Sequence, residues 1–189
     1  TTNLTTNVTV DRTGVGFNFA NGTTRRADLY VQDKISLMDG DLELTPGMRY
    51  ATFKIDPRPD ANYVAPVGQE PRVREDERVL KSLGALYRFD SGWQIWGHYG
   101  EGFKMPTSQQ LFQSNGTSLV PAPNLEPEEV ESIEVGVRRE MERGNFGINA
   151  FKADYTNFIQ SFYNIPGTSQ YTYRNLAEVR VWGVELDGA

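Results

Sequence analysis

Apolar and polar residues alternate along much of this chain, and that alternation predicts β-strands with two chemically different faces. The clearest example is residues 25–38, where apolar side chains recur at every second position over most of the stretch. Its apolar face consists of Leu29, Val31, Ile35 and Leu37. A tight turn at Asp39-Gly40-Asp41 leads into residues 42–55, which repeat the pattern. The two stretches are therefore predicted to form a hairpin.

The same alternation predicts further strands in the rest of the chain. They cover residues 77–89, 93–104, 130–142, 146–159 and 178–189. The first 24 residues are polar and glycine-rich, and we expect a loop there, although residues 8–12 and 14–19 could pair as short strands. Pro46 lies inside a predicted strand. Because proline cannot donate a ladder hydrogen bond, a bulge or a local loss of pairing is expected at that position.

Short turns alternate with long connections. The turns centre near Gly40, Ser91 and Arg143, which are 51 and 52 residues apart. Each turn is followed by a strand, a long connection and a returning strand. The long connections cover residues 56–76, 105–129 and 160–177. Outer-membrane barrels have this organisation, with short periplasmic turns, long extracellular loops and strands of about 9–11 residues across the bilayer. The pattern predicts an all-β fold, an antiparallel up-and-down transmembrane β-barrel segment of about seven strands.

A soluble β-sandwich or meander with one polar face is the alternative, because strand periodicity alone does not say what lies outside the sheet. The length of the connections argues against it. Hairpins usually turn in about 2–5 residues, and connections near 20 residues are uncommon unless they are functional. The barrel segment is therefore the preferred interpretation.

Composition narrows the classes of function. The chain has 189 residues, a net charge of −6, no cysteine and one histidine. The acidic balance argues against nucleic acid as a partner, since such binding depends on clustered Lys and Arg. Disulfides and thiolate metal sites are excluded. No apolar run approaches the roughly 20 residues of a membrane helix. The first residue falls inside a Thr- and Asn-rich stretch and residues 179–189 have the pattern of an unfinished strand, so we expect a piece of a longer protein, with any export signal outside it.

Two phrases in the long middle connection resemble a known family. Residues 103–107, FKMPT, resemble the FRAP box of TonB-dependent outer-membrane receptors of the haem/haemoglobin-uptake branch, and residues 121–128, PAPNLEPE, resemble the NPNL box of that branch. Other phrases typical of the family are LYVQDKISL, LTPGMRY, IEVGVR, NAFKADYTNFI and VRVWGVELDG. The resemblance extends from about Arg25 to the end of the chain and rests on the order and spacing of these phrases.

The resemblance implies a barrel of about 22 strands with an N-terminal plug, of which residues 1–189 would form part of the barrel domain, the plug lying outside this chain. The implied protein is a transporter in the bacterial (Gram-negative) outer membrane that takes up iron as haem, from haemoglobin or free, or as an iron chelate. The haem or ferric chelate would be cargo, with no resident cofactor. The implied partners are TonB, acting through the absent N-terminal part, outer-membrane lipid, and a haem-carrier protein at the extracellular loops.

Candidate ligand-binding residues follow from the boxes and from the loop between them. In the haem branch a histidine between the boxes is the usual axial ligand, but residues 107–122 contain no His, Tyr or Cys. Met105 offers a thioether to haem iron or packs the loop. His98 lies five residues before the first box. It is either a ligand to haem or metal or an ordinary polar strand residue. The candidates are His98, Phe103, Lys104, Met105, Gln109, Gln110, Phe112, Asn115 and Asn124.

Enzymatic chemistry has little support. The single histidine has no evident serine partner, so a catalytic triad is not predicted. The carboxylates Glu128, Glu129, Glu131 and Glu134 could act as acid and base, but they suit a solvated strand entrance better. No metal site is predicted, since Asp39-Gly40-Asp41 lacks a calcium-loop ligand series. Two rival interpretations are a free-standing small β-barrel that binds an apolar small molecule and an outer-membrane hydrolase that depends on His98.

Overall fold

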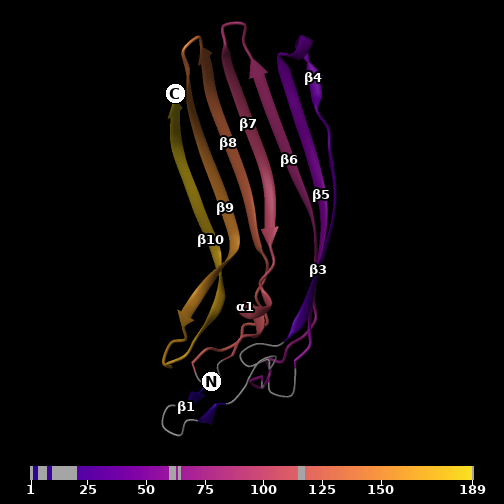
Figure 1. Ribbon diagram of the computed structural model, residues 1–189, viewed down its shortest axis with the longest axis vertical. Helices are drawn as coiled ribbons and strands as arrows, with labels where there is room; N and C mark the ends of the chain where they lie inside the picture. Colours follow the sequence, from indigo (N-terminus) through magenta and orange to yellow (C-terminus); the bar gives the residue numbers. More distant parts are fainter. Residues whose placement is uncertain are drawn as a thin grey trace.

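The chain folds into one long antiparallel sheet with its tight turns at one end and its long connections at the other (Figure 1). In the computed structural model, the described residues are 2–3, 8–9, 21–59, 63, 65–114 and 118–188. The sheet has eight strands in the order β10-β9-β8-β7-β6-β5-β3, with β4 also paired to β5. Strands that follow one another in sequence are neighbours, as the barrel interpretation requires.

The strands agree closely with the predicted stretches at the tight-turn end. Their bounds are β1 Thr2–Asn3, β2 Val8–Thr9, β3 Gly22–Gln32, β4 Ile35–Leu37, β5 Leu42–Pro57, β6 Arg74–Arg88, β7 Trp93–Lys104, β8 Glu128–Met141, β9 Gly144–Asn164 and β10 Tyr171–Gly188. A single-turn 3-10 helix, Met38–Gly40, connects β4 to β5, and a short helix α1, Ser108–Phe112, interrupts the middle connection. The 12 residues of β7 are those predicted.

One face of the sheet is apolar across its whole width. Residues directly opposite each other on paired strands share a face, and one such row runs unbroken from β4 to β10. It consists of Leu37, Leu42, Tyr87, Ile95, Val137, Ile148 and Leu186. Large apolar side chains on this face are open to the surroundings, with Leu29 75% and Trp182 74% exposed. We call it the apolar face.

The opposite face, the polar face, carries a different row one residue away. It consists of Ser36, Glu43, Leu86, Trp96, Gly136, Asn149 and Glu185. Its aromatic rings lie against neighbouring glycines: a Cβ on Gly136 would come within 2.5 Å of the Trp96 ring, and one on Gly183 within 2.8 Å of the Phe151 ring. The Trp96 and Phe151 rings therefore lie over the backbone of the neighbouring strand at these two glycines.

Pro46 explains an interruption in the first hairpin. The Asp33 backbone N–H donates to the Pro46 carbonyl at 3.1 Å, so the Pro46 nitrogen also points toward that strand but carries no hydrogen to return the bond. The pairing accordingly breaks between β3 and β4, while Pro46 stays paired with Leu83 on the other side. The predicted local loss of pairing is confirmed, and it falls where Asp33 interrupts the apolar pattern.

Two predictions for the long connections were wrong. Residues 160–177 are not one long loop, because β9 runs to Asn164 and β10 begins at Tyr171, which leaves only residues 165–170 as a turn. The hairpin bends at Asn157 and Phe162, both non-glycine residues with positive φ. The middle connection was predicted without regular structure and contains α1. Residues 8–9 pair with 2–3, and residues 14–19 lie outside the described residues.

The sheet is open within the described residues, with β3 and β10 at its edges. This differs from a free-standing small barrel, which would close on itself and would not leave an apolar face exposed along its length. No helix in the described part of the chain is long and apolar enough to cross a membrane.

Candidate functional site

The described residues of the connection between β7 and β8, 105–114 and 118–127, fold into a compact structure on the polar face, which we call the cap. Leu111 and Phe112 of α1 are fully buried. They belong to one apolar cluster with Leu119, Leu125, Ile55, Ile159 and Tyr173. Ile55 lies on β5 and Ile159 on β9, so the cap spans the width of three intervening strands. A loop with its own core is positioned by packing and not only by its ends.

Helix α1 begins at a capping box. The Thr107 hydroxyl accepts a hydrogen bond from the Gln110 backbone N–H at 3.2 Å, and the Gln110 side chain accepts one from the Thr107 N–H at 2.9 Å. These two bonds satisfy donors that a short helix otherwise leaves open. Pro106, which directly precedes the helix N-cap residue Thr107, is fully buried. Local sequence and packing therefore fix where α1 begins.

On the side of β8, β9 and β10, the cap is joined largely through backbone groups. The Asn175 side chain bonds both the N–H and the carbonyl of Glu126, at 2.9 and 3.0 Å, and also the Asn157 carbonyl at 2.6 Å. Val120 N–H donates to the Tyr171 carbonyl at 3.0 Å, and Tyr171 N–H donates to Ser118 at 2.8 Å. The cap and the β9–β10 hairpin thus form one continuous hydrogen-bonded unit.

Glu128 is the most buried charged residue at this junction, with 8% of the residue exposed. One carboxylate oxygen accepts the Ile159 backbone N–H at 2.7 Å, and the other receives Lys104 at 2.8 Å. A buried carboxylate is stable only when its oxygens are paired in this way. Glu128 therefore joins the end of β7, the start of β8 and the bend in β9.

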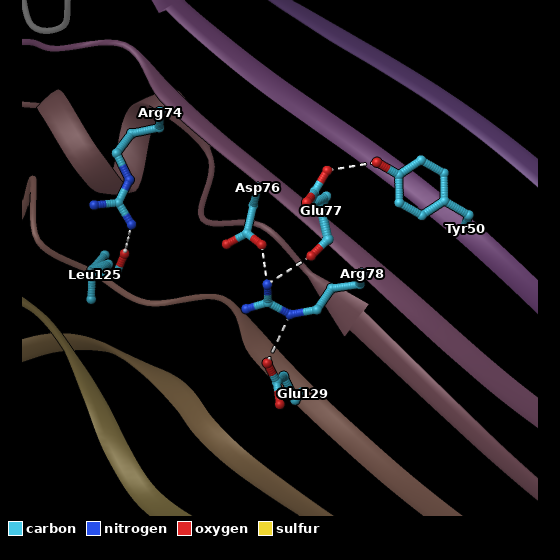
Figure 2. A network of polar contacts seen from close by, with 7 residues as sticks. All are labelled: Tyr50, Arg74, Asp76, Glu77, Arg78, Leu125 and Glu129. Atoms are coloured by element: carbon cyan, nitrogen blue, oxygen red, sulfur yellow. Dashed lines mark hydrogen bonds and ion pairs between the residues drawn. The ribbon is translucent and has the colours of Figure 1, made fainter.

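On the side of β6, long side chains of this strand reach the cap and the start of β8 (Figure 2). Arg74 donates to the Leu125 carbonyl at 2.9 Å, and Arg78 donates to the Glu129 carboxylate at 3.0 Å. Arg78 also contacts Asp76 and the Glu77 carbonyl. Arg72 donates to the Asn124 side chain. These contacts lie at or near the surface, unlike the buried junction at Glu128.

Tyr63, from the β5–β6 connection, reaches into the cap. Its hydroxyl donates to the Phe112 carbonyl at 2.7 Å. Burial raises the pKa of the Tyr63 hydroxyl above its usual value, so this group stays protonated and able to donate. Three connections therefore meet here: the β5–β6 connection, the cap itself and the β9–β10 hairpin.

The candidate residues occupy different environments. Met105 is 6% exposed and Phe112 is fully buried, so both fill the interior of the cap. Gln110 is engaged in the capping box. Lys104 and Asn124 are exposed but paired, with Glu128 and Arg72 respectively. Gln109 is exposed and donates to Gln113 at 3.0 Å. Asn115 lies outside the described residues. Ligand binding by these residues stays a prediction.

The two strand candidates lie outside the cap. His98 is on the polar face of β7, directly opposite Glu134, with its imidazole lying against Gly100. Phe103 has the opposite parity and is paired with Glu129. Within the described ranges, no group of three or more acidic, histidine or cysteine side chains is arranged to hold a metal ion.

A groove of about 500 Å³ runs over the outer side of the cap between the three connections. Its walls include Val67 and Gln69 from the β5–β6 connection, Asn124 from the cap and Arg174 from β10. Arg174 lies 3.6 Å from the centre of the Tyr163 ring and donates to Gln160 at 2.8 Å. The groove combines apolar, amide and guanidinium groups, which suits a partner of mixed polarity.

The sequence predicts a solvated strand entrance for Glu128, which is wrong because this residue is buried. Sequence reasoning missed Asn175, Arg74 and Arg78 as determinants of this site. The capping-box spacing at Thr107 and Gln110 was present in the sequence and would have indicated α1. No comparable local signal identifies the other four, because their partners lie on distant segments. Arg78 and Glu129, for example, are 51 residues apart.

Comparisons with known proteins agree with the architecture. The family model described as TonB dependent receptor-like, beta-barrel, matches residues 1–189. The chain is 28% identical over 141 residues to the "Probable hemoglobin and hemoglobin-haptoglobin-binding protein 4" of Haemophilus influenzae, covering 66% of this chain and 14% of that protein. It is 29% identical over 127 residues to the "Hemoglobin-haptoglobin utilization protein B" of Neisseria meningitidis serogroup C, covering 64% and 16%.

Solved structures show the same fold. The Serratia marcescens hemophore receptor HasR, solved in complex with its hemophore HasA and heme, aligns with a TM-score of 0.72 at 19% identity, over 88% of this chain and 32% of that one. The copper transporter OprC aligns with a TM-score of 0.79 at 14% identity, over all of this chain and 28% of that one. The chain spans less than a fifth of the length of both curated relatives.

Proposed function

The chain belongs to the TonB-dependent receptor β-barrel family, and on that premise we propose that it forms part of the wall and outer mouth of an outer-membrane receptor that takes up iron, as haem or as an iron chelate. The observation that supports the proposal most is the combination of an apolar row across the sheet with an ordered cap at one end of it. A lipid-embedded wall needs the first feature and a selective mouth needs the second.

The apolar face is proposed to contact outer-membrane lipid in a Gram-negative bacterium. Tyr50 and Tyr99 lie near the end of the apolar rows closest to the cap, and each donates to a carboxylate just beyond, Glu77 at 2.6 Å and Glu101 at 2.7 Å. Tyrosine is enriched at membrane interfaces because one end is apolar and the other polar. In this arrangement the cap lies on the extracellular side and the tight turns lie in the periplasm.

Haem is the cargo that the relatives favour, because two of them are named for haemoglobin and haemoglobin-haptoglobin. An iron chelate remains the second candidate cargo, since the ferripyoverdine receptor of Pseudomonas aeruginosa is also a relative, at 23% identity. Cargo or its carrier protein would meet the groove and the exposed Gln109, while TonB would act through a plug outside this chain. Met105 and Phe112 would support the cap without contacting cargo.

A growth experiment tests the proposal. A strain that lacks the full-length gene is complemented and grown with haemin, haemoglobin or a ferric siderophore as its only iron source, with and without TonB. We expect growth on at least one of the three that requires both the gene and TonB. Growth that is independent of the gene on all three iron sources would contradict iron uptake.

Haem titration separates the two candidate cargoes. The full-length receptor and its His98→Ala variant are titrated with haem while the Soret band is recorded. A shared, unchanged band means that His98 is not an axial ligand, and absence of any haem-dependent band favours an iron chelate. His98 is paired with Glu134 on neighbouring strands of the sheet, outside the cap, so we expect the variant to bind haem as the parent does.

A further inference from the structure

The sheet contains a seam between β6 and β7 at the level of the cap. The register of these strands runs from Arg88↔Gln94 only to Ser82↔Gly100, although β6 extends back to Arg74 and β7 continues to Lys104. Where the ladder stops, the Glu101 carboxylate accepts the Lys81 backbone N–H at 2.9 Å in place of a backbone carbonyl. The outer parts of β6 and β7 are therefore not joined by ladder hydrogen bonds.

The outer neighbours of the seam are fully paired. β6 remains in register with β5 as far as Ile55↔Arg74, and β7 remains in register with β8 as far as Lys104↔Glu128. Each side of the seam is thus a continuous piece of sheet. A relative movement that leaves secondary structure intact would occur most easily along this line, because no backbone ladder has to break there.

The cap is attached unequally to the two sides of the seam. Toward β8–β10 it is held by backbone bonds and by the buried Glu128. Toward β5 and β6 it is held by packing on Ile55, by the Tyr63 hydroxyl and by Arg74, which donates to the Leu125 carbonyl. Beside the cap, Arg78 of β6 crosses the seam to Glu129 at the start of β8 (Figure 2). The Arg78 and Glu129 side chains are 33% and 46% exposed, so water can replace their contact when they separate.

We propose that the cap opens at this seam, moving together with the outer parts of β7–β10 away from the outer parts of β3–β6 while the β6–β7 ladder below stays paired, and that Arg78 is the latch that holds it closed. The inference rests on the proposed transport function and concerns its regulation. Opening would also uncover Ile55, which is 1% exposed in the closed arrangement. Exposing this apolar side chain opposes opening, which therefore requires work from the transport cycle.

Cross-linking of the latch tests the proposal in the full-length receptor. Residues 1–189 contain no cysteine, so once any cysteine elsewhere in the full-length receptor has been replaced, Arg78→Cys and Glu129→Cys form a defined pair that a short thiol-specific cross-linker can join. We expect the cross-linked receptor to bind cargo at the cell surface but to lose at least roughly tenfold in TonB-dependent uptake. The uncross-linked pair sets the reference uptake, and the pair joined by a reducible linker should return to that reference after treatment with reductant.

The matched control joins strands that lie on the same side of the seam. Thr156 and Glu178 are directly opposite on β9 and β10, and cross-linking Thr156→Cys to Glu178→Cys should leave uptake unchanged. Unchanged uptake with a verified 78–129 cross-link, or equal loss with the control pair, would overturn the inference. If the parent receptor transports none of the iron sources, the proposed function fails first, and the two failures are distinguished.

A distance measurement tests the seam without transport. Spin labels at Gln109 and Val73 report on the separation of the cap from β6, and labels at Gln109 and Thr168 report on the cap relative to the β9–β10 hairpin. In the Arg78→Ala variant the first distance distribution should broaden toward longer values, while the second stays as in the parent. A change in both distributions, or in neither, would contradict a latch at Arg78.

Discussion

The wall and the cap are stabilised in opposite ways. The wall consists of backbone ladders between neighbouring strands, and its large apolar side chains face outward, as Leu29 and Trp182 do. The cap has one short helix, and its large apolar side chains face inward, as Leu111 and Phe112 do. The same kind of residue is therefore exposed in one region and buried in the other, which indicates that the two regions meet different surroundings.

That contrast assigns different tasks to the two regions. A ladder between sequential strands is insensitive to most single side chains, because each backbone bond persists when a side chain changes. The cap depends on a few contacts between distant segments, such as Tyr63 with Phe112 and Asn175 with Glu126. The wall can remain constant while the cap changes shape or specificity.

Truncation of the cap core should give the largest effect. Phe112→Ala removes a fully buried ring, and such a change costs about 3–5 kcal/mol. Amide hydrogen exchange in the cap should become faster by roughly a hundredfold or more, while exchange in β8 and β9 stays as in the parent. Gln109→Ala on the exposed side of the same helix is the control, with an expected change within about 0.5 kcal/mol. Equal acceleration in the wall would mean that cap and wall unfold as one unit.

A charge on the apolar face should have the next largest effect. Val135 lies on that face, paired with Ala150 and Gly97, and Val135→Lys should destabilise the membrane-inserted protein by about 2–4 kcal/mol because the charge would lie in the hydrocarbon. Ser132→Lys, three residues earlier on the polar face, should cost less than about 1.5 kcal/mol. Denaturant titrations of the full-length protein in lipid vesicles measure both. Equal costs would remove the membrane assignment of the apolar face.

The wall could be predicted from sequence because its information is local. Period-two alternation places Leu42, Leu44, Met48 and Tyr50 on one face regardless of the rest of the protein, and the Asp90-Ser91-Gly92 turn sets the start of β7. The predicted interruption at Pro46 was confirmed for the same reason, since a missing N–H is a property of one residue. The sheet order then follows from short turns between sequential strands.

The cap could be predicted only in part because its contacts are not local. The sequence predicts a loop over residues 160–177, whereas the strands continue through bends at Asn157 and Phe162. These bends could not be predicted, because a positive φ in a phenylalanine has no sequence signature. Phe112 is a predicted ligand contact, and the structure buries its ring inside the cap. Its burial depends on Ile55 and Tyr173, more than 50 residues away on each side. Tertiary packing decides whether such a side chain is buried, and the alternation of apolar and polar residues does not reveal that packing.

Removal of the buried carboxylate at the junction should have a smaller but clear effect. Glu128→Ala leaves the Ile159 N–H without its acceptor and Lys104 without its partner, which costs about 1–3 kcal/mol. Hydrogen exchange at Ile159 and at the start of β8 should report the loss. Glu128→Gln keeps an acceptor for the N–H and should recover part of it. If both variants exchange like the parent, the cap is held by its apolar core alone.

An exposed ion pair on the wall should have the smallest effect. Lys54 and Glu75 lie opposite each other on β5 and β6 at 2.5 Å, with side chains 43% and 63% exposed. Water solvates both groups when the pair is broken, so Lys54→Ala should cost only about 0.2–1 kcal/mol, with the higher values at low salt.

The strands that carry Lys54 and Glu75 stay joined by their backbone ladder, whereas no ladder connects Arg78 to Glu129. Arg78→Ala should therefore loosen the cap visibly in limited proteolysis of residues 118–127, and Lys54→Ala should not. Equal protection of the two variants would show that side-chain contacts across the seam contribute no more than ordinary surface pairs.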